Sequence, residues 1–530
     1  MKKYIFNIII ILTVGFTVYS CDEFLDVMPD NRTQLDNPQK IKDLLVTSYP
    51  AANYALVAEL SGDNLIDNRS ENATLRTDAY ERMDTELFEW LDVASSTSSD
   101  SPYFLWEGYY QSIAAANQVL EAIDKLAASG DETNMDAQKG EALMLRAYCH
   151  FMLVNIFAKA YKDEELSKND LGVTYMTKPE TKVLVHYDRN SVEEVYELIA
   201  QDIEEGFVLI DDKSYQVPKY HFTKAASAAF ASQFYLYKRD YDNVIKYADI
   251  VLGANTLSTS LRDWTTIYSN PESELTAYIS ANEPANLLLL PTYSVYARRF
   301  ARYRYALNGS SLLGTVNGAG PTWSSRPPFL SGWVWTYGQE YGLVIPKTDE
   351  LFEYTDKVAG IGYPHIVRTE FTTDDVMLNR AEAKIMKGNI EGALVDLQYW
   401  NSSHKNTTVL TRQNITSFYT PARTTAVFTF HNTELSPKFV ITAEQKPFID
   451  CVLHFRRLER ILEGHRWFDL KRYGIELNRK VGRDKRDITL TYDDERRAIQ
   501  IPSDVIGAGL QPNPRVEPAK DENLTLTLVY

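Results

Sequence analysis

Residues 222–253 read FTKAASAAFASQFYLYKRDYDNVIKYADIVLG. The first half is rich in small alanines, which allow a neighbouring helix to approach closely. The second half carries aliphatic and aromatic residues at helical spacing, and the tetrapeptide KRDY at 238–241 separates the two halves. The stretch therefore predicts a hairpin of two helices that turns at residues 238–241.

A second stretch, MLNRAEAKIMKGNIEGALVDLQYW at 377–400, follows the same plan and turns at KGNI, residues 387–390. Aligning the two turns places three pairs of residues at equivalent positions: Tyr241 with Ile390, Val244 with Ala393, and Ala248 with Leu397. Each unit resembles a tetratricopeptide repeat, whose period is about 34 residues. Because long insertions separate the units, we expect a helical frame with irregular excursions rather than a regular solenoid.

Three further stretches have the spacing of helices. Residues 109–126 and 140–161 place apolar side chains at three- and four-residue steps. A third helix is expected from Ser191, because Glu194 follows three residues later and completes a capping-box pattern. The sequence thus predicts a mostly α fold with a few short strands. We expect one domain over residues 21–530, with a helical block to about 255 and an insertion-rich block over 256–530.

Three long excursions differ in composition from the helical stretches. Residues 60–104 are rich in Asn, Asp and Ser, and residues 308–341 are rich in Gly, Pro and aromatic residues. Residues 401–450 contain alternating segments such as TTAVFTFHN and predict loop with short strands. Loops of this length are usually functional or disordered, and the aromatic residues of 308–341 favour order. The apolar run ANLLLLPTYS at 285–294 is too short to span a bilayer and predicts a buried strand or helix.

The N-terminus has the pattern of an export signal. Lys2 and Lys3 precede an apolar run that is shorter than the about 20 residues of a membrane-spanning helix but suits a signal peptide. Ser20-Cys21 at its end resembles a bacterial lipobox. We therefore expect residues 1–20 to be a lipoprotein signal peptide and Cys21 to carry the lipid anchor. An ordinary signal peptide with an incidental cysteine is the alternative.

Composition excludes some partners. The chain has 530 residues and a net charge of −17, which repels nucleic-acid backbones and anionic headgroups. The remaining cysteines, Cys149 and Cys451, lie in helical patterns and are expected to be small buried residues. No HExxH, GxSxG or Walker motif occurs, so the sequence predicts neither a cofactor nor an enzyme.

Several blocks follow one another in a specific order along the chain: CDEFLDVMPD at 21–30, LWEGYYQSIAAANQVLEAI at 105–123, GEALMLRAYCHFMLVNIFAKAY at 140–161, YDRNSVEEVYELIAQDIEEG at 187–206, ERILEGHRWFDLKRYG at 459–474 and IQIPSDVIGAGLQPNPR at 499–515. Together with the two hairpins, they resemble the SusD/RagB family of outer-membrane nutrient-binding lipoproteins over nearly the whole length.

The resemblance implies a starch- or glycan-binding protein rather than an enzyme. It implies a location on the cell surface, attachment to the outer membrane through the lipid anchor, and delivery of an oligosaccharide to a SusC-like TonB-dependent transporter. A peptide-binding uptake or scaffold lipoprotein of the same fold, as in RagB-like relatives, is the alternative. The ligand residues of the family lie in variable loops, so no motif carries them over to this chain.

Two clusters suggest chemistry but have simpler explanations. His465 and Asp469 could form a catalytic pair, yet they belong to a block that the resemblance assigns to the scaffold. Cys451 and His454 have the spacing of zinc ligands, but no second pair follows. The sequence therefore predicts no catalytic residue and no metal site.

Sugar rings are bound by flat aromatic faces together with polar side chains that accept and donate hydrogen bonds. The excursion 308–341 supplies Trp323, Trp333, Trp335 and Tyr337. An extended backbone would place the last three on one face, because successive side chains alternate. Packing of these rings into the core is the alternative.

The first excursion supplies the polar side chains of this hypothesis. Asp63, Asn64, Asp67, Asn68 and Arg69 lie within seven residues of one another. A long polar loop can bind a ligand or can simply be solvated. We expect these five residues and the four aromatic residues to form the ligand-binding site.

Overall fold

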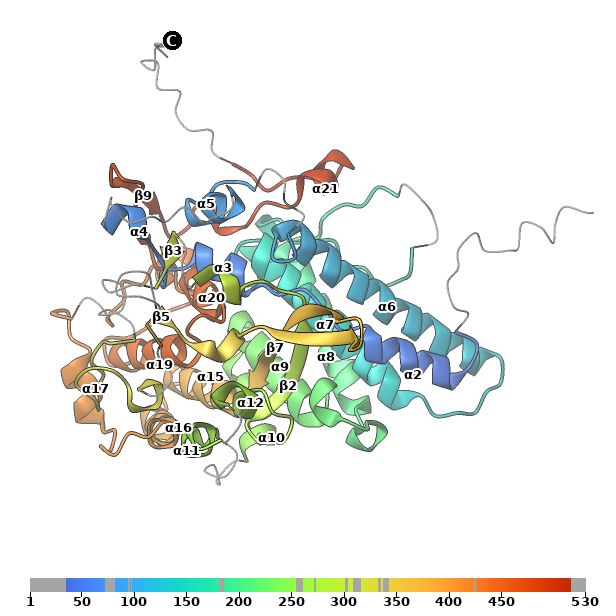
Figure 1. Cartoon of the computed structure of the whole chain (residues 1–530), viewed down its shortest axis with the longest axis horizontal. Helices are drawn as coiled ribbons and strands as arrows, with labels where there is room; N and C mark the ends of the chain where they lie inside the picture. The colour runs from blue at the N-terminus through green and yellow to red at the C-terminus, as the bar shows by residue number, and fades with distance from the viewer. Residues whose placement is uncertain are drawn as a thin grey trace, which may run out of the picture.

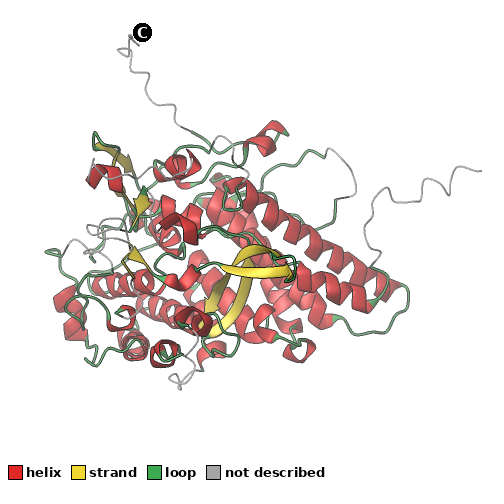
Figure 2. Ribbon diagram, in the orientation of Figure 1, coloured by secondary structure: helices red, strands yellow, loops and turns green. Residues whose placement is uncertain are grey.

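The computed structural model describes residues 35–71, 82–93, 96, 98–180, 185–253, 261–270, 273–300, 304–307, 316–331, 335–336, 343–423 and 426–515. Helices dominate and the strands are few and mostly short, as predicted (Figure 2). Within these residues, no helix is both long enough and apolar enough to cross a bilayer. The predicted signal peptide and Cys21 lie outside the described residues, and the boundary near residue 255 stays a prediction.

The long helices are α2 (Pro38–Thr47), α6 (Pro102–Ala128), α7 (Asp136–Phe157), α8 (Val192–Leu209), α9 (Lys224–Lys238), α10 (Tyr241–Leu252), α15 (Thr373–Met386), α16 (Ile390–Ser403) and α19 (Lys446–Glu459). The shorter helices are α3 (Ala55–Ser61), α4 (Asn68–Glu71), α5 (Arg82–Phe88), α11 (Trp264–Tyr268), α12 (Glu274–Tyr278), α13 (Ala297–Phe300), α17 (Arg412–Phe418), α18 (Asn432–Leu435), α20 (His465–Arg472) and α21 (Ser503–Gly507).

The strands are β1 (Ile66–Asp67), β2 (Asn286–Thr292), β3 (Tyr305–Ala306), β4 (Trp335–Thr336), β5 (Leu343–Val344), β6 (Leu351–Asp356), β7 (Ile361–Thr372), β8 (Leu477–Val481) and β9 (Arg486–Leu490). Single 3-10 turns are η1 (Ser167–Asn169), η2 (Asp212–Ser214), η3 (Pro218–Tyr220), η4 (Pro328–Leu330), η5 (Pro346–Thr348) and η6 (Glu495–Arg497).

The N-terminal half is built around α7, which packs against α6, α8 and α9 (Figure 1). The sequence predicts one apolar face for this helix, but residues 140–157 are buried on every side because neighbours cover them all round. Gly140 of α7 and Gly206 of α8 lie so close that an added Cβ on Gly140 would be 2.8 Å from the Gly206 carbonyl oxygen. Close backbone packing of this kind requires glycine at the contact.

The two predicted helical hairpins are confirmed as α9–α10 and α15–α16. Their turns are equivalent: Arg239 and Gly388, each the second residue of its turn, both adopt the left-handed conformation, with φ of 66° and 77°. Asp240 and Asn389, the next residues, cap the second helix of each hairpin by accepting a backbone N–H three residues on. The same local geometry therefore follows from KRDY and from KGNI.

One buried arginine joins the hairpins. Arg380 of α15 donates through Nε and Nη2 to the Asp396 carboxylate of α16 at 3.0 and 2.8 Å. It also donates to Asp249 of α10 at 2.7 Å and to the Gly253 carbonyl at 3.0 Å. The planar guanidinium group can serve several acceptors at once, which a lysine could not do with the same geometry.

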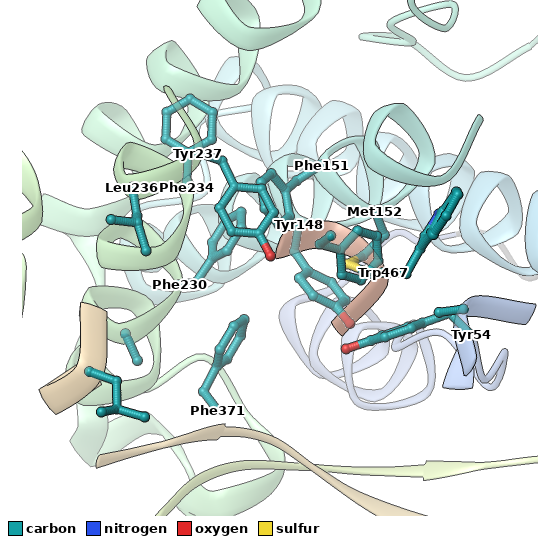
Figure 3. Packing of buried hydrophobic residues seen from close by; sticks show 14 of the residues in the cluster. Tyr54, Tyr148, Phe151, Met152, Phe230, Phe234, Leu236, Tyr237, Phe371 and Trp467 are labelled. Carbon is teal, nitrogen blue, oxygen red and sulfur yellow. The ribbon is translucent and has the colours of Figure 1, made fainter. Parts of the chain in front are cut away.

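Most of the apolar run at 285–294 forms β2, a largely buried edge strand of a three-stranded antiparallel sheet in the order β2–β7–β6. An aromatic core lies between this sheet and the helices (Figure 3). Tyr148 of α7 packs edge to face on Phe230 of α9, with ring centroids 5.7 Å apart, and on Phe371 of β7 at 5.9 Å. The core thus fixes the sheet against the central helices.

The segment from the end of α19 through α20, residues 456–472, carries several buried basic side chains. Arg460 donates to the Asp375 carboxylate of α15 through Nε and Nη2. Arg456 and Arg472 both contact the Glu382 carboxylate, also on α15. All of these side chains are buried. Charges are tolerated inside a protein when they are paired, so this segment is tied to α15.

The same segment reaches the N-terminal half. Lys471 donates to the backbone carbonyls of Asn155 and Ala158 at the end of α7, at 2.6 Å each. Arg466 forms a two-pronged ion pair with Asp63, with both N–O distances 2.8 Å. Residues that are hundreds of positions apart in the sequence are therefore held together by α20.

The prediction of short strands within 401–450 is wrong for its described residues, which form α17, α18, the ends of α16 and α19, and loop. In the expected strand, backbone N–H and C=O groups of Phe428 form hydrogen bonds with side chains instead of with a neighbouring strand. The Phe428 N–H donates to Asp450, and Lys446 donates to the Phe428 carbonyl.

Replacing Glu382 with glutamine tests the buried charge network. Glu382→Gln removes one of the two carboxylates that Arg456 and Arg472 share, the other being Asp469, so we expect the free energy of unfolding to fall by about 3–5 kcal/mol. Urea unfolding measures the change. The control is Glu391→Gln, which disrupts an exposed pair with Arg412 and should cost less than about 1 kcal/mol. Equal losses in the two variants would contradict the role of Glu382.

Candidate functional site

The first two excursions meet at their bases. Strand β1 of the first pairs antiparallel with β3, which precedes the second, through Asp67 opposite Tyr305. Arg304 donates to both carboxylate oxygens of Asp67, with distances between 2.6 and 3.0 Å. Phe88 stacks on Tyr305 at a centroid distance of 4.3 Å. The structure therefore brings together the two segments that the sequence predicts to share a site.

Asp100 closes the first excursion against the chain that leaves β2. Its carboxylate accepts from the Ser294 hydroxyl at 2.5 Å and from the Val295 N–H at 3.0 Å. Burial raises the pKa of the Asp100 carboxyl to about 6 although both hydrogen bonds oppose the shift. Tyr293, which directly precedes these residues, is consequently held at the base of the first excursion.

The predicted polar residues are used within the fold. Burial alone would raise the pKa of Asp63, but Arg457 and Arg466 outweigh it and hold the pKa below its ordinary value. Asn64 is fully buried, where it donates to Glu59 at 2.9 Å and accepts from Arg457 at 2.8 Å. These contacts give both side chains a structural role, and their predicted ligand binding stays a prediction.

Asp67 and Asn68 are likewise fully buried, and the Asn68 N–H donates to the Arg304 carbonyl at 2.8 Å. Arg69 is half-buried, and its N–H donates to the Asp67 carboxylate at 3.0 Å. The predicted polar cluster is therefore the anchored base of the first excursion. A role in ligand binding remains a prediction for these three residues.

Trp323 is nearly buried against α19. Only 9% of its surface is exposed, and its ring packs on His454 and Phe455 of α19 at 5.8 Å. Its indole N–H donates to the Gly318 carbonyl at 3.1 Å. A Cβ at Gly320 would overlap the indole at 2.1 Å, so the ring lies directly on this glycine. This position favours packing, and sugar binding by Trp323 stays a prediction.

The other three predicted aromatic residues lie wholly or partly outside the described structure. Trp333 and Tyr337 lie outside the described residues. The backbone of Trp335 belongs to β4 and pairs with Val344 of β5, but the Trp335 side chain is not among the described parts of the structure. Their predicted alternation on one face stays a prediction.

A partly exposed aromatic pair that the sequence did not reveal lies on the three-stranded sheet. Tyr293 is 44% exposed and meets Tyr363 of β7 edge to face, with ring centroids 5.2 Å apart. The Glu353 carboxylate beside the Tyr363 hydroxyl raises the pKa of Tyr363 to about 12, so this phenol stays protonated at neutral pH. Two phenol faces and a carboxylate are thus available together at the surface. We call Tyr293, Tyr363 and Glu353 the tyrosine surface.

A second exposed pair lies on the opposite face of the same hairpin. Phe352 and Tyr354 of β6 are 47% and 52% exposed, and their rings meet edge to face at 4.9 Å. Gly362 lies across from them in β7, where a Cβ would approach the Phe352 ring to 2.7 Å. The alternation in LFEYTD could have indicated a strand with exposed rings, but it gives no sign of which face is covered.

Among the described residues, one group has the composition of a metal site: Asp374, His404 and Glu459, all buried. His404 lies 2.6 Å from Glu459 through Nε2 and 2.7 Å from the Trp400 carbonyl through Nδ1. Both ring nitrogens face acceptors, and a metal ion would have to break the bond to Glu459. The arrangement therefore favours an internal ion pair over a metal site.

The two clusters that resemble chemical motifs make their contacts within the fold. His465 contacts the Tyr54 hydroxyl at 3.1 Å, whereas Asp469 is paired with Arg456 and Arg472. Burial holds the pKa of His465 well below its ordinary value, which keeps the imidazole neutral. Cys149 and Cys451 are free, buried thiols, as predicted, and burial raises the pKa of each.

Comparison with known families agrees with this architecture. The family described as "Starch-binding associating with outer membrane" matches residues 23–236, and the family described as "SusD family" matches residues 336–506. The chain belongs to the SusD family. The resemblance found in the sequence blocks is therefore confirmed.

Individual relatives are distant in sequence. A SusD-like protein of Formosa agariphila is 21% identical over 89% of this chain and 92% of its own length. A SusD superfamily protein of Bacteroides thetaiotaomicron has a solved structure with a TM-score of 0.60 and 18% identity, covering 90% of this chain and 99% of that one. The solved structure of a SusD-like carbohydrate binding protein of Bacteroides vulgatus has a TM-score of 0.56 and 16% identity, covering 89% of this chain and 96% of that one. At these identities the solved structures support the fold alone.

The buried Glu59 beside Asn64 predicts a pH dependence of stability. Burial raises the pKa of Glu59 from 4.5 to about 7, although Asn64 and the Gly464 N–H donate to it. Because the folded pKa exceeds the unfolded value, this contribution to stability is present below pH 4.5 and is lost as the pH rises to about 7.

Glu59→Gln removes that titration. We expect the unfolding free energy of the wild type relative to this variant to fall by about 3 kcal/mol between pH 4.5 and pH 8, since each pKa unit is worth ~1.4 kcal/mol. Urea unfolding at both pH values measures it, and Glu205→Gln on the exposed side of α8 is the control. A difference that does not change with pH would show that Glu59 titrates normally.

Proposed function

We propose that this chain is a cell-surface lipoprotein that binds oligosaccharides and delivers them to a SusC-like TonB-dependent transporter of the outer membrane. The observation that carries the proposal is membership of a family described by starch binding at that membrane. A structural relative described as a carbohydrate binding protein is consistent with it. The lipobox at Cys21 supplies the means of attachment.

The tyrosine surface has the chemistry that a sugar requires. The phenol rings of Tyr293 and Tyr363 offer apolar faces to the C–H groups of pyranose rings, and Glu353 can accept hydrogen bonds from sugar hydroxyls. Each aromatic contact contributes roughly 0.5–1.5 kcal/mol beyond the buried area. A few such contacts give dissociation constants in the range of about 1 μM to 1 mM.

Weak binding suits a tethered protein that hands its ligand on. A lipid anchor holds the protein at the membrane, so a transporter beside it meets the captured sugar at a raised effective concentration. A ligand bound at micromolar to millimolar affinity also dissociates quickly, because affinity differences lie mostly in the dissociation rate. Delivery therefore needs no chemical step.

Removal of the exposed rings tests the proposed binding surface. Tyr293→Ala and Tyr363→Ala should each weaken binding of an oligosaccharide about fivefold, equivalent to ~1 kcal/mol of lost stacking. Isothermal titration against a panel of neutral plant and starch oligosaccharides provides the measurement. The matched control is Tyr220→Ala, which removes an exposed tyrosine on η3.

Three outcomes separate the alternatives. Glycan binding that both variants leave unchanged would exclude the tyrosine surface while leaving the function intact. Saturation by mixed peptides but by no glycan would favour the peptide-binding alternative. Release of shorter sugars from any oligosaccharide by the purified protein would show an enzyme.

A further inference from the structure

A pocket of about 310 Å³ is lined by residues of α6, by residues 174–180 and 185–187, and by residues 505–510 near the end of the described chain. None of the residues that line it belongs to the tyrosine surface or to the site predicted from the sequence. Its volume falls within the range of small-molecule sites, which starts at about 300 Å³. The pocket is thus large enough for one or two sugar rings.

Hydrogen bonds to the central helices hold one wall of the pocket in place. The Tyr110 hydroxyl donates to the Thr174 carbonyl and the Asn117 amide donates to the Met176 carbonyl, both at 2.9 Å. The Met176 N–H lies 3.0 Å from Nε2 of the buried His150. A wall fixed in this way need not be ordered when a ligand enters, which favours affinity.

The lining combines aromatic faces with an unused donor. Trp106 and Tyr110 lie 4.9 Å apart with ring planes inclined by 47°, and Tyr187 lines the pocket as well. Within the part of the chain that the structure describes, the Trp106 indole N–H and the Gln118 amide make no hydrogen bond to another residue. An indole that is 92% covered normally finds a hydrogen-bond partner for its N–H, so this donor is available to a ligand.

The charge of the pocket selects for an uncharged ligand. Lys178 and Glu180 line it with opposite charges, His186 lines it as well, and Gln118 and Thr174 add neutral polar groups. An anion or a cation would meet one attractive and one repulsive group. A neutral molecule with apolar faces and many hydroxyl groups can use the rings, the amide and both charged groups together.

We propose that this pocket is a second saccharide site, which binds one or two rings of a neutral sugar against Tyr187, with the Trp106 indole N–H as a hydrogen-bond donor. The choice of a sugar among neutral amphipathic molecules rests on the proposed function. The pocket and the tyrosine surface share no residue, so the two sites can succeed or fail separately.

The test uses the Tyr293→Ala/Tyr363→Ala protein, in which the tyrosine surface is removed and the pocket remains. Saturation-transfer NMR and isothermal titration with maltose, cellobiose, lactose and gentiobiose measure binding. Ala114→Trp, added on the exposed part of α6 that lines the pocket, should fill it and weaken binding at least tenfold. Ala127→Trp, near the end of the same helix and outside the pocket lining, is the matched control and should change nothing.

A second substitution removes a ring without filling space. Tyr187→Ala should weaken binding at least threefold, and thermal melts of all variants should agree within about 2 °C, since none of the substituted residues is buried.

Each contrary result has a distinct meaning. Binding to the wild type but not to the Tyr293→Ala/Tyr363→Ala protein would overturn the second site and leave the proposed function standing. Binding that survives Ala114→Trp would also overturn the second site. Failure of the wild type to bind any of these sugars or longer oligosaccharides would overturn both proposals.

Discussion

The basic side chains between residues 456 and 472 are buried, and they find partners on several other parts of the chain. Arg460 and Arg472 pair with carboxylates of α15, Lys471 reaches carbonyls at the end of α7, and Arg466 pairs with Asp63. The free-energy cost of burying a charge without a partner exceeds the stabilisation from burying any one apolar side chain, so these elements must assemble together. This constraint explains why the segment EGHRWFDLKRYG is so rich in charge although it lies inside the protein.

The same constraint separates scaffold from surface. At the base of the first excursion, Asp67 accepts hydrogen bonds from Arg304 and Asn64 accepts one from Arg457. These polar side chains are buried, whereas the tyrosines of the tyrosine surface remain accessible to a ligand. Tyr293 and Tyr363 lie in contact at the surface of the three-stranded sheet, and Trp106 lines a pocket whose wall is hydrogen-bonded to α6 and α7. Rigid placement limits the entropy lost when a flexible sugar binds.

The helices could be predicted well from the sequence, because apolar periodicity, capping residues and turn geometry all depend on residues that are close together in the chain. The hairpin turns at Arg239 and Gly388 and the cap at Ser191 follow directly from the sequence. The site was less predictable, since exposure depends on what covers a residue. Asn64 has the composition of a loop ligand but is buried by a distant arginine, whereas Tyr293 ends an apolar run and is exposed. Spacing along the chain carries no information about such distant partners.

Tethered capture of sugars at the cell surface is tested most directly by mass spectrometry of the mature N-terminus, isolated from the membrane fraction of cells that make the native protein. The predicted result is a chain that begins at Cys21 with fatty acyl groups on that residue and that is accessible to protease on intact cells. A soluble periplasmic protein with an unmodified thiol at Cys21 would contradict the proposed tether.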